Sequence, residues 1–149
     1  MSACKNLEKL EVGFNKLTDQ SLSELKFLPN LKRLDLSRLH LSERSLMSLS
    51  GLKGIKYLCL RQNRDLNDKS MRLLPCQESL LGLDLTEVSV TSKVGLELQG
   101  LKKLNALRLD GDRFGAPERE KLKRYLPHCY ITYAVNSGHL PIEIFRPLH

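Results

Sequence analysis

The sequence predicts one α/β domain in which a short strand, a turn and a helix repeat along the chain. A six-residue pattern of leucines, L-x-x-L-x-L, occurs five times at nearly constant intervals. The second half of the pattern alternates apolar and polar residues, as a strand with one buried face requires. Further along each repeat, a helix-start signal usually precedes apolar residues at helical spacing. A chain of 149 residues has the size of one such domain.

The expected strands lie at the starts of the repeats. The five copies are Leu7–Val12, Leu31–Leu36, Ile55–Leu60, Leu80–Leu85 and Leu104–Leu109. Their first residues are 24, 24, 25 and 24 positions apart, and the longer interval arises from Asp65, which is inserted in the third repeat. A sixth start at Cys129, 25 positions further on, opens the strand-like stretch Cys129–Val135, which we expect to close the sheet.

The turns and helices have local signals of their own. The ninth position is Asn15 in the first repeat and Asn63 in the third, where an amide can satisfy backbone groups of the turn. Leu39 and Val88 replace it in the second and fourth repeats, so we expect an interrupted ladder of amides. The expected helix starts are Thr18, Ser42, Asn67, Thr91 and, for the fifth helix, Pro117.

The repeat resembles the leucine-rich repeat family over residues 4 to about 135. The run Leu17-Thr-Asp-Gln-Ser-Leu22 and its echo Leu66-Asn-Asp-Lys-Ser-Met71 are similar to the ribonuclease-inhibitor and cysteine-containing subtypes, which are common in F-box substrate adaptors. The sequence contains no F-box. The resemblance implies a right-handed, curved horseshoe segment of five repeats with a C-terminal closing strand, and a role in protein recognition.

The C-terminal residues 136–149 differ in character from the repeat domain, residues 1–135. Pro141 and Pro147 exclude this tail from a central strand. We expect Leu140, Ile142 and Phe145 to fold back over the last repeat, and the alternative is a linear segment that docks into a partner.

Composition and spacing exclude several functional classes. The four cysteines, Cys4, Cys59, Cys76 and Cys129, have no metal-binding spacing, so we expect free thiols, no metal and no cofactor. No apolar run reaches the length of a membrane span, and the N-terminus has no secretory signal, so an intracellular, cytoplasmic protein is expected.

We expect no catalytic residue. Glu11 and Asp35 lie on neighbouring predicted strands, about 5 Å apart. However, solvated carboxylates on an open face keep ordinary pKa values, and no nucleophile stands beside a base.

The outward positions of the strands are the candidate partner-binding surface on the concave face. Its residues are Arg33, Asp35, Tyr57, Cys59, Arg61, Asp84, Arg108 and Asp110. Tyr57 is the expected anchor, because it is the only aromatic residue at the third, fifth and seventh positions of the five repeats.

The charge leaves alternatives open. The chain carries 24 Lys and Arg against 17 Asp and Glu. A basic edge is formed by Lys5, Lys32, Lys53, Lys56, Lys102 and Lys103. The concave face is of mixed charge, whereas nucleic acid requires a continuous positive groove. We therefore predict a non-catalytic protein-interaction module, an adaptor or scaffold. The alternatives are a basic scaffold on nucleic acid or a ribonucleoprotein, and the recognition part of a larger ubiquitin-ligase adaptor.

The N-terminal end is expected to be open. Cys4 stands three residues before Leu7, as Leu28 stands before Leu31, so it has the place of the last turn of an earlier repeat. Solenoids normally protect their terminal apolar faces. We therefore expect either a longer repeat protein or a covering partner, which includes a second copy of the chain.

Overall fold

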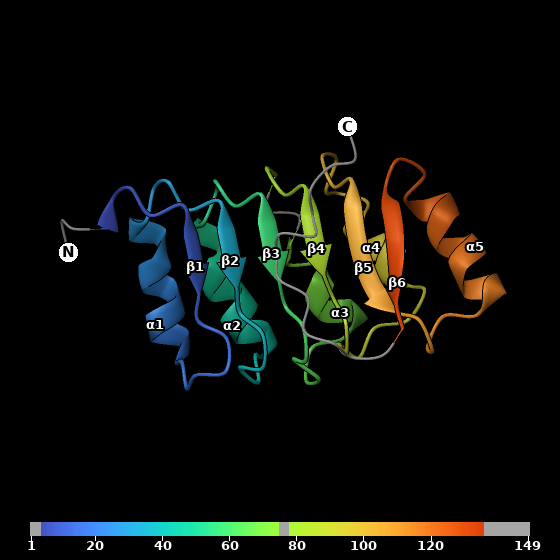
Figure 1. The fold of residues 1–149 in the computed structure, drawn as a ribbon, viewed down its shortest axis with the longest axis horizontal. Helices are drawn as coiled ribbons and strands as arrows, with labels where there is room; N and C mark the ends of the chain where they lie inside the picture. Colours follow the sequence, from blue (N-terminus) through green and yellow to red (C-terminus); the bar gives the residue numbers. More distant parts are fainter. Residues whose placement is uncertain (1–3, 75–77, 136–149) are drawn as a thin grey trace.

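The computed structural model describes residues 4–74 and 78–135, and the predicted roles of the tail fall outside them. In the described residues, six parallel strands form one sheet in the order of the sequence, and helices alternate with them (Figure 1). The strands are β1 (Lys9–Glu11), β2 (Arg33–Asp35), β3 (Tyr57–Cys59), β4 (Gly82–Asp84), β5 (Ala106–Asp110) and β6 (Tyr130–Ala134). The predicted α/β class is confirmed, and the arrangement is compatible with a solenoid.

The strand register follows the alignment of the five sequence copies. Leu34 of β2 pairs with Leu10 of β1 on one side and with Leu58 of β3 on the other. Leu83 then pairs with Leu58, and Leu107 with Leu83. The fourth position of every copy therefore stands in one column across the sheet.

The register of β6 differs from the prediction by one residue. The N–H of Cys129 donates to the carbonyl of Leu126 (3.1 Å), as expected for the start of a repeat. The strand then pairs Ile131 with Leu107, so one residue is missing directly after Cys129 relative to the other copies. This deletion turns Ile131 and Tyr133, instead of the polar Thr132, toward the core.

The helices pack against one face of the sheet (Figure 1). They are α1 (Asp19–Ser23) with the 3₁₀ turn η2 (Glu24–Phe27), α2 (Glu43–Ser48) with η3 (Leu49–Gly51), α3 (Asp68–Met71), α4 (Val94–Leu98) and α5 (Ala116–Tyr125). None of the described helices has the length and apolar character needed to span a bilayer.

Three of the predicted helix starts are confirmed. Thr18, Ser42 and Asn67 are N-caps whose side-chain oxygens accept backbone N–H groups of the first turn. The fourth prediction places the start too early, because the Thr91 hydroxyl accepts the N–H of Lys93 in a turn, and α4 begins only at Val94. Pro117 is the second residue of α5.

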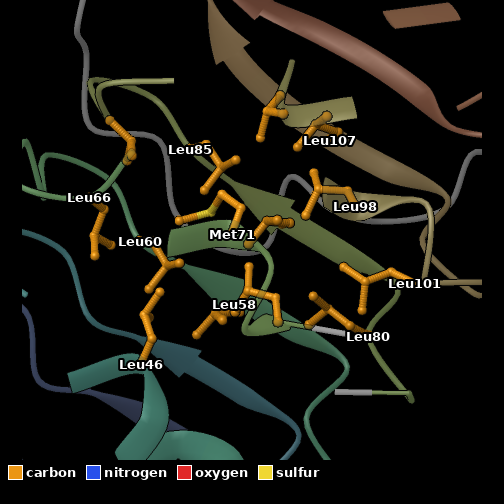
Figure 2. Packing of buried hydrophobic residues seen from close by; sticks show 14 of the residues in the cluster. Leu46, Leu58, Leu60, Leu66, Met71, Leu80, Leu85, Leu98, Leu101 and Leu107 are labelled. Carbon is orange, nitrogen blue, oxygen red and sulfur yellow. The ribbon is translucent and has the colours of Figure 1, made fainter. Parts of the chain in front are cut away.

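The core lies between the sheet and the helices. Leucines of the fourth and sixth strand positions are buried, including Leu34, Leu36, Leu58, Leu60, Leu83 and Leu85. Figure 2 shows part of this cluster, where side chains from helices α3 and α4, Met71 and Leu98, join the strand leucines. The predicted continuous core is confirmed.

The core becomes more exposed at β1. Leu7, Leu10 and Val12 are only partly buried. The N–H of Leu7 donates to the carbonyl of Cys4 (3.0 Å), as that of Leu31 does to Leu28 (3.2 Å), so Cys4 holds the predicted place. That a longer repeat protein or a partner covers this end stays a prediction.

One amide serves the turns of two repeats. The Asn63 side chain is fully buried, and its Nδ2 donates to the carbonyls of Leu36 (2.9 Å) and Leu60 (2.8 Å). Its Oδ1 accepts the N–H groups of Leu39 (3.0 Å) and Leu41 (3.1 Å). The second repeat, which has Leu39 at the place of the amide, therefore uses the amide of the third.

The fourth repeat is supported by the fifth in the same way. Asp110 accepts the N–H of Glu87, and Arg113 donates to the carbonyl of Val88 (2.7 Å). The supporting side chain thus belongs in both cases to the following repeat.

Candidate partner-binding surface

The sheet face away from the helices brings the predicted site residues together. Arg33 pairs with Tyr57, and Asp35 with Cys59, across β2 and β3. Cys59 then pairs with Asp84, and Asp84 with Arg108. Arg61 and Asp110 follow at the carboxyl ends of β3 and β5.

Burial divides these eight residues into two groups. Asp35, Tyr57, Cys59, Arg61 and Asp84 are each 9% exposed or less. Arg33, Arg108 and Asp110 are half-buried. The expectation of solvated carboxylates on an open face is therefore wrong for Asp35, and Asp84 is buried as well. Of the eight residues, Arg33, Arg108 and Asp110 offer more surface to a partner.

The buried aspartates hold the ends of their own strands. Oδ1 of Asp35 accepts the N–H of Ser37 (2.8 Å) and the Ser37 hydroxyl. Oδ1 of Asp84 accepts the N–H of Thr86 (2.8 Å) and the Thr86 hydroxyl (2.6 Å). Burial raises the pKa of Asp84, although the bonds from Thr86 and the charges of Arg108 and Arg61 oppose the shift. Both carboxylates thus serve as hydrogen-bond acceptors for the turn that follows their strand.

Tyr57 and Arg33 form a pair on this face. The guanidinium carbon of Arg33 lies 5.0 Å from the centroid of the Tyr57 ring, within cation–π distance. Arg33 is the more accessible of the two, so a partner that reaches Tyr57 also meets Arg33.

Cys59 is a poor nucleophile at neutral pH. Burial, followed by the charges of Asp84 and Asp35, raises the pKa of its thiol to about 12. The thiol therefore stays protonated, and it is the thiolate that reacts. The part of the chain that the structure describes also contains no group of three His, Cys, Asp or Glu side chains that could hold a metal ion.

A second row of side chains, at the eighth position of the repeats, lies where the chain leaves the strands. We call Phe14, Arg38, Gln62 and Glu87 the rim row. All four are in the left-handed region, with φ of 63°, 55°, 59° and 56° respectively. This conformation costs roughly 1 kcal/mol or more for a residue with a side chain, and glycine would avoid the cost.

The rim row is continuous from repeat to repeat. The guanidinium carbon of Arg38 lies 4.7 Å from the centroid of the Phe14 ring, and Arg38 Nε donates to Gln62 Oε1. Gln62 Nε2 donates to Glu87 Oε1 (2.6 Å). Glu87 Oε2 pairs with Arg64 Nη2 at 2.9 Å. Side chains of different types are therefore connected across four repeats.

Glu87 carries the negative charge of this row. Burial on its own would raise the pKa of Glu87, but hydrogen bonds from Arg64 and Gln62 and the charge of Arg61 hold the pKa below its ordinary value. The carboxylate is thus ionised at neutral pH and balances two arginines.

The row ends at an open cavity of about 400 Å³. The cavity is lined by Arg64, Thr86, Glu87, Ser89, Asp110, Asp112, Arg113 and Ala134. Both oxygens of Asp110 accept the N–H of Glu87 at 3.0 Å, and Arg113 lies 3.9 Å away. The mixed charges of the cavity suit polar groups of a protein better than a phosphate, because a phosphate favours a site that is purely basic or lined by backbone N–H groups.

The rim row was missed by sequence reasoning. Phe, Arg, Gln and Glu share no property, and none of them is the glycine or asparagine that commonly marks a left-handed residue. The only available signal is the constant place of these residues, two positions after the last apolar residue of each copy.

No protein-family model matches the chain, and a search of curated proteins finds no match.

Proposed function

We propose that this chain is a leucine-rich-repeat module that binds another protein and performs no chemistry of its own, as an adaptor or scaffold subunit. The leucine columns, their register and the turn amide of Asn63 support the assignment to this repeat. A stack of such units offers one broad, curved surface to a partner.

The rim row is the observation that carries the proposal. Strained residues persist where the surrounding structure fixes them, and they cluster at functional sites. Here four consecutive repeats keep a side chain in a conformation that glycine would adopt without cost. The aromatic ring of Phe14, 58% exposed, and the arginine stacked on it are the residue types that carry binding energy in interfaces.

The proposed contact surface joins the rim row to the accessible residues of the sheet face. Arg33, Arg108 and Asp110 would supply charge matching, and Tyr57, which is only 9% exposed, would contribute mainly by holding Arg33 at cation–π distance instead of as the anchor itself. A partner for this surface carries charges of both signs.

Two exposed phenylalanines allow a matched test. Phe14 and Phe27 are each 58% exposed, and each ring lies under a cation, at 4.7 Å and 5.0 Å respectively. The immobilised chain first captures proteins from an extract with and without nuclease. The affinity of the captured protein is then measured by calorimetry for the parent, Phe14→Gly and Phe27→Ala.

We expect Phe14→Gly to lower the affinity about tenfold or more, and Phe27→Ala to change it by less than about twofold. Because glycine relieves the left-handed strain, Phe14→Gly should unfold at no lower urea concentration than the parent. Equal affinities of the parent and Phe14→Gly would remove the rim row from the interface. Capture that disappears with nuclease would instead favour the nucleic-acid alternative.

A further inference from the structure

The two edges of the sheet differ in how their charges are paired. At the carboxyl ends of the strands, Arg64 pairs with Glu87 at 2.9 Å, and Arg113 lies 3.9 Å from Asp110. We call the opposite edge, where the strands begin, the lysine edge. It carries Lys5, Lys32, Lys53, Lys56, Lys102 and Lys103, with the two acidic residues Glu8 and Glu78.

Backbone hydrogen bonds fix the positions of these lysines along the edge. The N–H of Lys32 donates to the carbonyl of Glu8 (2.9 Å), and that of Lys56 to the carbonyl of Lys32 (2.8 Å). Lys32 and Lys56 are therefore neighbours one strand spacing apart, about 4.8 Å.

Side chains of residues further along the chain donate hydrogen bonds to the backbone carbonyls of two further lysines. Asn30 Nδ2 donates to the carbonyl of Lys5, and the Ser79 hydroxyl donates to the carbonyl of Lys53, both at 2.7 Å. The backbone under each cation is thus tied to the next repeat. Because this backbone is already ordered, the chain loses less conformational entropy when a partner binds to the edge.

Most of this positive charge is not neutralised. Lys32 pairs with Glu8 at 2.5 Å. The other five lysines are exposed, and within the described ranges, 4–74 and 78–135, none of them forms an ion pair. The pKa of Glu8 is lowered by its hydrogen bond to Lys32 and by the charges of Lys32, Arg33 and Lys56. Several cations therefore act on this single carboxylate.

We propose that the lysine edge binds an acidic segment of a partner protein. Opposite charge at the border of an interface steers the encounter and fixes its orientation. Glu8 and Glu78 interrupt the row of lysines, whereas a nucleic-acid backbone favours a continuous positive surface. The edge therefore fits carboxylate side chains better than a nucleic-acid backbone. This inference does not depend on the rim row, because the two surfaces lie at opposite ends of the strands.

A charge-reversal experiment on the whole chain tests the inference without a known partner. The probe is a fluorescent decapeptide of glutamate, and its binding is measured by anisotropy at about 25 mM and about 150 mM salt. The test variant is Lys53→Glu with Lys56→Glu. The control is Lys121→Glu with Lys123→Glu, two exposed lysines of α5 that give the same change in net charge. A DNA duplex of matched charge is the competing probe.

We expect the test variant to lose about tenfold or more of the affinity for the peptide, and the control to lose less than about threefold. Circular dichroism should show that both variants stay folded, because the substituted side chains are exposed. Equal losses in the two variants would show that only net charge matters and would overturn the proposal. Tighter binding of the duplex than of the peptide at the higher salt would overturn it in favour of nucleic acid.

Discussion

Replacement of Asn63 by alanine should have a large effect on stability, because its amide satisfies backbone groups of two repeats. The variant loses two bonds to carbonyls, at 2.8 and 2.9 Å, a longer one to the carbonyl of Arg61, at 3.4 Å, and two bonds from N–H groups, at 3.0 and 3.1 Å. Each buried hydrogen bond contributes about 0.5–1.5 kcal/mol net, and the unpaired backbone groups add a desolvation cost. We expect Asn63→Ala to lower the free energy of unfolding by about 3–5 kcal/mol.

Urea unfolding followed by far-ultraviolet circular dichroism measures this loss, since the chain has no tryptophan to report by fluorescence. Asn15→Ala is the matched control. Asn15 has the same place in the first repeat, but it is exposed and bonds only to the carbonyls of Val12 and Gly13. Asn15→Ala should lower the free energy of unfolding by less than about 1 kcal/mol. Similar losses in the two variants would refute the shared role of Asn63.

Three further changes test other parts of the fold. Leu83→Ala should lower the free energy of unfolding by about 2–5 kcal/mol through lost burial and a cavity, and unchanged urea unfolding would contradict the assigned core column. Gly95→Ala should lower the free energy of unfolding by about 1–2 kcal/mol, because a Cβ there would lie 2.9 Å from Tyr125. Gly54→Ala, whose Cβ would have its nearest contact at 3.5 Å, should lower it by less than about 0.5 kcal/mol in the same assay. Since burial raises the pKa of Asp84 in the folded chain, its contribution to stability is present at low pH and is lost as the pH rises through the folded pKa. The stability of Asp84→Asn relative to the parent should therefore increase between about pH 3 and pH 7, and a constant difference in urea unfolding would contradict the shift.

The sequence was sufficient for features that depend on residue type and period. The leucine columns predicted the strand register, because a shift by one residue would expose every leucine of a strand. The capping residues Thr18, Ser42 and Asn67 marked helix starts because their side chains can satisfy free N–H groups. Asn63 was identified through the same hydrogen-bonding logic.

Features that depend on three-dimensional surroundings were not predicted. The burial of Asp35 and Asp84 follows from their bonds to Ser37 and Thr86 together with the neighbouring strands, which the pattern alone does not reveal. The left-handed conformation of the rim row is imposed by the turn and not by residue type. The deletion after Cys129 follows from the pairing of Ile131 with Leu107, which the spacing of 25 residues does not reveal.

The support of one turn by the following repeat gives this row of strands and helices a direction. Asn63 completes the second repeat, and Asp110 with Arg113 completes the fourth. When unfolding starts at the β6 end, loss of the fifth repeat leaves backbone groups of the fourth turn unpaired, and loss of the third repeat does the same to the second turn. When unfolding starts at the β1 end, these two turns keep those supports. During synthesis from the N-terminus, the second and fourth turns therefore gain these hydrogen bonds only after the following repeat has been made.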